Sequence, residues 1–137
     1  MATENFQMHE RLQNDTIFVK DLKLCRLVLM NNAIYPWFIL IPRQNNAVEI
    51  IDLSTKDQQI LTQEVSQISY MLKDIFKADK LNVAALGNMV PQLHMHIIAR
   101  FKNDLTFPAP IWIKNDAEQY APDKAQEIIG KVLEYLD

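Results

Sequence analysis

The spacing of apolar residues predicts three strands in the first third of the chain. Apolar side chains recur through Thr16–Asp21 and Leu24–Met30, and the short interval between these runs favours an antiparallel pair. Trp37–Ile41 is apolar without a break and is followed by Pro42, which is typical of a strand buried on both faces. These three strands open the predicted sheet.

Helical spacing is found in three other places. In Thr55–Lys77 apolar residues recur three and four positions apart, and Ser54 with Asp57 predicts the N-terminal cap of this long helix. A second helix is predicted to begin near Pro122, and a short one lies in Phe6–Asn14. We expect the long helix to pack its apolar side against the sheet.

The second half of the chain predicts a hairpin. Leu81–Leu86 is the next predicted strand, Gly87–Asn88 is the tight turn, and Val90–Arg100 pairs back against the strand. Phe107–Ile113 contains two prolines, which exclude a helix, and aromatic residues that either fold over the domain or face a partner. This order of elements predicts an α+β fold: an antiparallel sheet of about five strands, one long helix and a C-terminal helix.

Length and composition limit the classes of protein that fit. A chain of 137 residues predicts a single domain over 1–137. No apolar run is long enough to span a membrane and the first residues lack the blocks of a signal peptide, so we expect a cytoplasmic protein. A net charge of -3 gives no global basic field for nucleic acid, and 2 glycines are too few for the glycine-rich dinucleotide and phosphate motifs.

The main chemical signal is a stretch in which polar and apolar residues nearly alternate. Because successive side chains of a strand point to opposite faces, Gln92, His94 and His96 are predicted to project from one face together. The apolar residues that alternate with them are expected to pack in the core: Leu93, Met95 and Ile97. Two imidazoles beside an amide can supply a nucleophile, an acid or a ligand near neutral pH.

Two other interpretations of the histidine pair stay open at this point. Such a pair also arises on the solvated face of a half-exposed sheet. Zinc needs three or four protein ligands, but the third histidine, His9, lies in the N-terminal segment, and the single cysteine, Cys25, is expected to be a core residue. We therefore predict no metal site.

The run Gly87–Ile98 resembles the signature of the histidine triad (HIT) family of nucleotide hydrolases and transferases, in which three histidines alternate with apolar residues. Gln92 stands in place of the first histidine. His94 matches the middle one, which in that family attacks the α-phosphorus and becomes nucleotidylated, and His96 matches the third. The resemblance implies an enzyme similar to diadenosine tetraphosphate hydrolase, acting on a dinucleoside polyphosphate or a nucleotide phosphoramidate without a cofactor.

The same resemblance assigns roles to residues outside the motif. Asn31 would meet the ribose hydroxyls, although Asn31 and Asn32 together also fit a simple turn. Asn88 would touch phosphate, and the backbone amides around Gly87 and Met89 would face an anion. In the family two protomers commonly pair through the long helix and a sheet strand, so the resemblance also implies a homodimer.

Three positions depart from the family pattern. Gln92 cannot titrate, although its amide can donate a hydrogen bond. Phe38 stands where the family often has another histidine, and Met89 stands where Ser or Thr can assist the leaving group. These departures, with the segment Phe107–Trp112, support an alternative: a catalytically weak nucleotide- or protein-binding module on the HIT fold.

Overall fold

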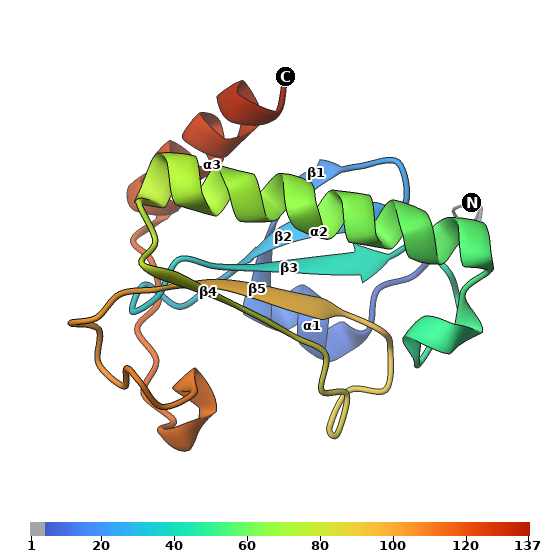
Figure 1. Cartoon of the computed structure of the whole chain (residues 1–137), viewed down its shortest axis with the longest axis horizontal. Helices are drawn as coiled ribbons and strands as arrows, with labels where there is room; N and C mark the ends of the chain where they lie inside the picture. Colours follow the sequence, from blue (N-terminus) through green and yellow to red (C-terminus); the bar gives the residue numbers. More distant parts are fainter. Residues whose placement is uncertain (1–4) are drawn as a thin grey trace.

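The structure, a computed structural model, describes residues 5–137 and contains one antiparallel sheet. Its five strands lie in the order β1-β2-β3-β5-β4, so β1 and β4 form the two edges (Figure 1). The strands are β1 (Thr16–Asp21), β2 (Cys25–Met30), β3 (Trp37–Pro42), β4 (Lys80–Ala84) and β5 (Met95–Arg100). The predicted α+β class and number of strands are confirmed.

Helix α2 (Thr55–Phe76) is the long helix that the apolar spacing predicts. The N–H of Asp57 donates to Ser54 Oγ over 3.1 Å, which confirms Ser54 as the N-cap residue. Lys77, in a left-handed conformation with a φ of 58°, ends the helix one residue earlier than predicted. The helix therefore runs along the sheet for most of its length (Figure 1).

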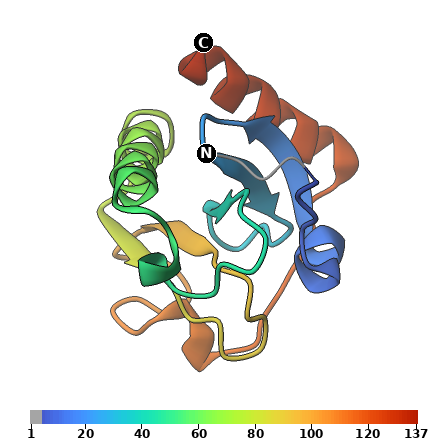
Figure 2. The same cartoon turned by 90° about the vertical axis from the view of Figure 1, so that its right-hand side faces the viewer.

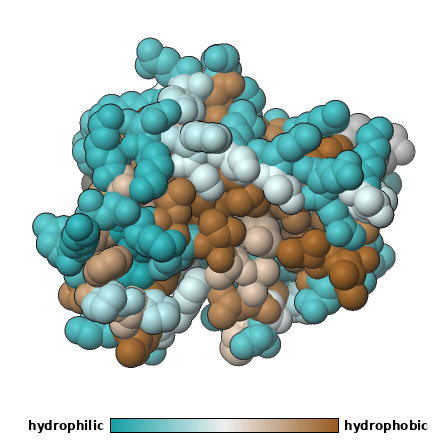
Figure 3. All heavy atoms as spheres, viewed as in Figure 1, coloured by the Kyte–Doolittle hydropathy of each residue, from teal (hydrophilic) through white to brown (hydrophobic). Residues whose placement is uncertain are grey.

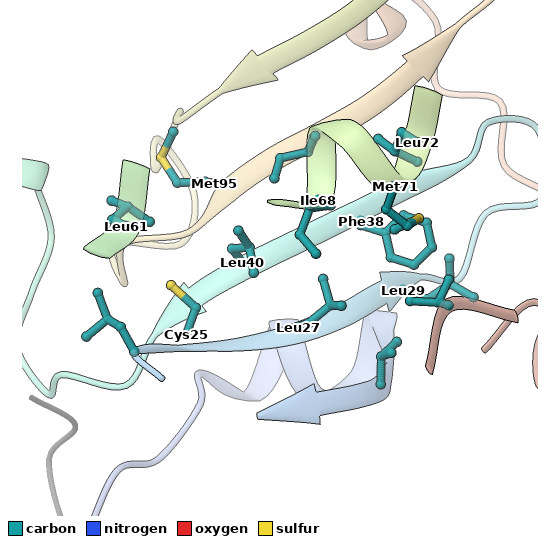
Figure 4. Packing of buried hydrophobic residues seen from close by; sticks show 14 of the residues in the cluster. Cys25, Leu27, Leu29, Phe38, Leu40, Leu61, Ile68, Met71, Leu72 and Met95 are labelled. Atoms are coloured by element: carbon teal, nitrogen blue, oxygen red, sulfur yellow. The ribbon is translucent and has the colours of Figure 1, made fainter. Parts of the chain in front are cut away.

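One face of the sheet is covered by α2 and by α3 (Pro122–Leu136), the predicted C-terminal helix. Side chains of α2 pack onto β3 and β5 there, as Figure 4 shows for Ile68 of α2 beside Leu40 of β3. Cys25 is fully buried in the same cluster, as expected, and burial raises the pKa of its thiol far above the usual range. This face therefore forms the larger core.

The opposite face carries a second apolar cluster and the candidate site. It is covered by α1 (Glu10–Asp15), by the 3₁₀ turn η2 (Ile111–Ile113) and by loops, so the sheet lies between α1 and α2 (Figure 2). Strand β3 is buried along its whole length, as its apolar run predicts. Helix α1 is shorter than predicted, because it begins only at Glu10.

Two predictions of local structure are wrong. The predicted strand Val90–Arg100 begins only at Met95, and residues 85–94 form a long connection between β4 and β5 rather than a tight turn at Gly87–Asn88.

Two short 3₁₀ turns complete the fold as described. In the proline-rich segment, residues 111–113 form one 3₁₀ turn after Pro110. A further 3₁₀ turn, η1 (Ile50–Asp52), precedes α2.

Arg100 fixes the segment that follows β5. Its guanidinium is buried, donates to both carboxylate oxygens of Asp104, and also donates to the carbonyl of Ala109. Although burial acts to raise the pKa of Asp104, the Arg100 guanidinium and the N–H groups of Phe101 and Phe107 lower it to about 2. The ion pair thus holds residues 101–110 against the sheet and directs the chain toward η2.

Among residues 5–137, no helix combines the length and apolar character that crossing a bilayer requires.

Candidate functional site

His94 and His96 lie side by side on the second face, with ring centroids 4.9 Å apart. His96 belongs to β5, where its neighbours across the sheet are Ile39 and Ala84, and His94 lies just before that strand. The imidazoles are only 7% and 6% exposed, so the interpretation of a solvated sheet face is wrong. Leu93, Met95 and Ile97 point into the larger core, as predicted.

The hydrogen bond of His94 determines which ring nitrogen carries the proton. Nδ1 lies 2.6 Å from the backbone carbonyl oxygen of Gln92. A carbonyl can only accept, so Nδ1 must donate and hold a hydrogen. In the neutral ring Nε2 then carries the lone pair, which makes His94 a nitrogen nucleophile.

His96 has the opposite arrangement. The indole Nε1–H of Trp37 donates to Nδ1 of His96 over 3.0 Å, and an indole can only donate. Nδ1 therefore carries the lone pair, and the hydrogen of the neutral ring sits on Nε2. Burial, and secondarily the neighbouring His94, lower the pKa of His96 to about 4. Near neutral pH this residue is an uncharged Nε2–H donor.

The sequence analysis did not predict the contact between Trp37 and His96. Phe38 was predicted to stand in place of a further family histidine, but its side chain is buried in the larger core, 6.0 Å from the ring of Phe76. Trp37 lies on the histidine face and makes the contact with His96. Counting alternate positions back from Ile39, which shares that face, would have identified Trp37.

A cavity of about 480 Å³ opens beside the two imidazoles. Three predicted residues of the β4–β5 connection line it together with His94 and His96: Gly87, Asn88 and Met89. Gly87 has a φ of 76°, a conformation that suits glycine and turns the connection at this point. The structure therefore brings five of the predicted site residues to one cavity.

Asn31 lies outside that cavity, in a neighbouring one of about 450 Å³. The two cavities share residues of their lining: Arg11, Asp15, Met30, Trp37, Trp112 and Asn115. Asn31 Oδ1 accepts from the N–H of Tyr120, and Asn32 Oδ1 accepts from Ile34 and Glu118. Both asparagines thus hold the chain before α3, which is more than the simple turn considered from the sequence.

Gln92 does not line the cavity that contains both histidines. It borders a smaller cavity of about 330 Å³ on another side of His94, together with Glu49 and Leu86. Its side-chain amide accepts from the N–H of His9 and donates to the carbonyl of Gln7. The predicted sharing of one strand face by Gln92, His94 and His96 is therefore wrong for Gln92.

Trp112 is a second aromatic residue that the sequence did not assign to the site. Its ring lies 5.2 Å from His96 and 6.1 Å from Trp37 between centroids, in both cases edge to face. The side chain is 40% exposed and lines both cavities. Within Phe107–Ile113, Ile111 is buried in the second apolar cluster, as folding over the domain predicts, whereas Ile113 is 68% exposed. A partner-facing role of this segment stays a prediction.

Metal coordination has no candidate in the part of the chain that the structure describes. Among residues 5–137, no group of three or more His, Cys, Asp or Glu side chains is arranged to hold a metal ion. The cavity is lined by the imidazoles of His94 and His96, by two indoles and by the amides of the β4–β5 connection.

Comparisons with known proteins agree with this geometry. Residues 11–103 match the family model of the HIT domain. A solved histidine triad protein from Bradyrhizobium japonicum is 44% identical, with a TM-score of 0.92 over 95% of this chain and 97% of that chain. Another, from Marinobacter aquaeolei VT8, is 42% identical, with a TM-score of 0.93 over 96% of each chain. The α+β fold is thus shared with histidine triad proteins along almost the whole chain.

A curated relative carries the name of an enzyme. The bis(5'-adenosyl)-triphosphatase of Saccharomyces cerevisiae is 28% identical over 96 residues, which is 66% of this chain and 47% of that protein. The chain therefore spans about half the length of the curated relatives it matches.

Proposed function

This chain belongs to the HIT domain family, and on that premise we propose that it cleaves nucleotides at the α-phosphate through a nucleotidyl-His94 intermediate. The substrate is a dinucleoside polyphosphate or a nucleotide phosphoramidate. The yeast relative is named for an adenosine dinucleotide of this kind, which supports the first class. A nucleoside monophosphate is then released by water, or passed to another acceptor in a transferase reaction.

The observation that carries the proposal is the pair of opposite protonation patterns in neighbouring imidazoles. The lone pair of His94 Nε2 forms a bond to the α-phosphorus, and the P–O or P–N bond to the leaving group breaks. A polyphosphate or nucleotide departs as its anion, and a departing amine takes up a proton from solvent. The ring then bears positive charge, which the hydrogen bond from Nδ1 to the Gln92 carbonyl stabilises. Water attacks phosphorus in a second step, the N–P bond breaks, and His94 returns to its starting form.

Three further groups stabilise, in this proposal, the negative charge that develops on the phosphoryl oxygens. The Nε2–H of His96 donates to a phosphoryl oxygen without gaining or losing a proton, because Trp37 occupies Nδ1. Asn88 and the backbone amides around Gly87 and Met89 line the same cavity and supply other donors. Asn31, in the adjoining cavity, is assigned to the ribose.

The test is intact-protein mass spectrometry after brief incubation with diadenosine tetraphosphate and, separately, an adenosine phosphoramidate. We expect an adenylyl adduct on the wild type and none on His94→Ala. Gln59→Ala is the control, because it removes an exposed side chain of α2 that does not line the cavity of His94 and His96, and it should keep the adduct. Absence of both adduct and AMP release in the wild type would favour the binding-module alternative.

Two copies of the chain are proposed to pair through β4 and α2, which follows the family pattern. Strand β4 is an edge strand, and Val83 on β4 and Tyr70 on α2 are 44% and 68% exposed. Figure 3 shows hydrophobic side chains gathered on the face below α2, where β4 lies in Figure 1. Large exposed apolar groups beside a sheet edge are typical of a protein interface.

A cytoplasmic location stays a prediction.

A further inference from the structure

Residues 5–9, here called the strap, run in extended form past the β4–β5 connection before α1 begins. Their side chains alternate as in a strand. Phe6 and Met8 pack against the second apolar cluster, and the side chain of Gln7 is exposed. The ring of Phe6 also lies 5.6 Å from the Arg26 guanidinium. The strap is thus bound to the sheet side of the molecule through its even-numbered residues.

The other edge of the strap is bound by two side-chain amides. Gln92 Oε1 accepts from the N–H of His9 over 2.7 Å, and Gln92 Nε2 donates to the carbonyl of Gln7 over 2.9 Å. Asn45 makes the same two kinds of hydrogen bond two residues earlier along the strap. Its Oδ1 accepts from the N–H of Gln7 over 3.3 Å, and its Nδ2 donates to the carbonyl of Asn5 over 3.1 Å.

These four hydrogen bonds follow the geometry of a sheet ladder. Backbone groups of alternate residues point to the same edge of an extended chain, and here that edge belongs to residues 5, 7 and 9. A primary amide offers a donor and an acceptor side by side, which fits a C=O and the N–H two residues later. The two nitrogens of an imidazole point in diverging directions and do not fit this pair of groups.

We propose that Gln92 and Asn45 are positioning residues that hold the strap and, through it, the α1 wall of the substrate cavity. Helix α1 follows the strap directly and contributes Arg11, Leu12 and Asp15 to the cavity of His94 and His96. Gln92, at the first position of the histidine motif, then couples the motif to the N-terminal segment. The link to substrate rests on the proposed function; the link to α1 does not.

The four hydrogen bonds that Gln92 and Asn45 make with the strap are here called the clasp. Hydrogen exchange of individual backbone amides, measured by NMR, tests the clasp without any substrate. Gln92→Ala should speed exchange at His9 by about tenfold and leave Gln7 protected, because Asn45 still accepts from Gln7. Asn45→Ala should give the reverse. Both variants should speed exchange in α1 and shift the Leu12 methyl signals. Unchanged exchange at His9 in Gln92→Ala, or an unchanged α1 in both variants, would overturn the proposal.

Steady-state kinetics tests the consequence for substrate. Both variants should raise KM by about three- to tenfold with little change in kcat, because only a fraction of molecules then holds α1 in the binding position. Gln59→Ala is the matched control: it removes an exposed amide on α2 and should change neither constant. A large fall in kcat for Gln92→Ala alone would show that Gln92 acts on the substrate directly and would overturn the positioning role.

The two proposals fail in different assays. If wild-type protein forms no adduct with either nucleotide, the proposed function fails, yet the exchange rates of His9, Gln7 and α1 still decide whether the clasp exists. If the adduct forms and exchange at His9 does not respond to Gln92→Ala, the clasp fails while the nucleotide chemistry stands.

Discussion

At the scale of single residues, each imidazole of the candidate site has its protonation pattern set by one neighbouring group. A backbone carbonyl requires a hydrogen on Nδ1 of His94, and an indole N–H requires a lone pair on Nδ1 of His96. Neither partner titrates: the carbonyl accepts and the indole N–H donates at every pH considered. The pair therefore presents a nucleophile and a donor at the same time, with no proton exchanged between them beforehand.

The low pKa of His96 predicts a loss of stability in acid. In the unfolded chain this imidazole has its usual pKa near 6.5, whereas in the folded protein the pKa is about 4. Between these values the unfolded state binds a proton that the native state does not. The free energy of unfolding should therefore fall as the pH falls through this window, by about 3 kcal/mol in full.

Urea denaturation at a series of pH values measures this effect. The difference in stability between about pH 7 and pH 5 should be about 2 kcal/mol smaller in His96→Asn than in the wild type, because asparagine does not titrate. Equal slopes in the two proteins would mean that His96 is not the group that takes up the proton.

Trp37→Phe should remove the hydrogen bond that fixes the tautomer of His96. The variant leaves the buried Nδ1 without its donor, so the hydrogen of the ring can move from Nε2 to Nδ1. We expect kcat/KM to fall by about tenfold, and the ¹⁵N signals of His96 to show a mixture of tautomers. Trp112→Phe, which keeps the bond from Trp37, should leave these signals unchanged; the same mixture there would argue against a specific role for Trp37.

Sequence reasoning found the two histidines but not their partners. Alternation in a strand is visible in the sequence, so His94 and His96 could be predicted, and Gly87, Asn88 and Met89 followed from the family motif. The hydrogen bond from Trp37 to His96 was not predicted, because the family position was aligned one residue away, at Phe38. The direction of the Gln92 amide depends on the strap, a contact across more than eighty residues, and no local pattern encodes it.

At the scale of elements, Glu64 joins the long helix to the start of β2. Its carboxylate is buried and accepts from the N–H groups of Leu24 and Cys25, at 3.0 and 2.9 Å. Arg43 binds the neighbouring carbonyls of Leu22 and Leu24 from the end of β3. The turn between β1 and β2 is thus fixed by charged side chains of elements that lie beside it.

Glu64→Ala should lower the free energy of unfolding by about 3 kcal/mol, because it leaves two buried N–H groups without an acceptor. Chemical denaturation monitored by circular dichroism measures the loss. Glu127→Ala is the control: that residue has only exposed ion pairs on α3, so the change should stay within about 0.5 kcal/mol. Similar losses in the two variants would contradict the role given to Glu64.

Elements with a strong local period were predicted well, and connections were not. The apolar runs located β1, β2 and β3, and the spacing with Ser54 located α2. The alternation before β5 continues backward past Met95, so the sequence placed the start of the strand too early. Its true start depends on the neighbouring strands: β3 pairs with β5 from Met95 onward, and β4 pairs with it from His96 onward.

At the scale of the whole molecule, the two edges of the sheet differ in what they are expected to bind. We predict a dimer through β4, so Val83→Glu should convert the protein to a monomer in light scattering coupled to gel filtration. Phe18→Glu places the same charge on an exposed apolar position of the other edge strand, β1, and should leave the dimer intact. The opposite pattern would place the interface at β1.

The four hydrogen bonds that Gln92 and Asn45 make with the strap all go to main-chain atoms of residues 5, 7 and 9. They therefore restrict the path of residues 5–9 and place no demand on the chemical identity of the side chains at positions 5 and 7. Mutational tolerance along the strap should then follow a two-residue rhythm, in which the inward residues Phe6 and Met8 resist replacement and the outward ones accept it. In this sense the N-terminal segment is recognised by its shape.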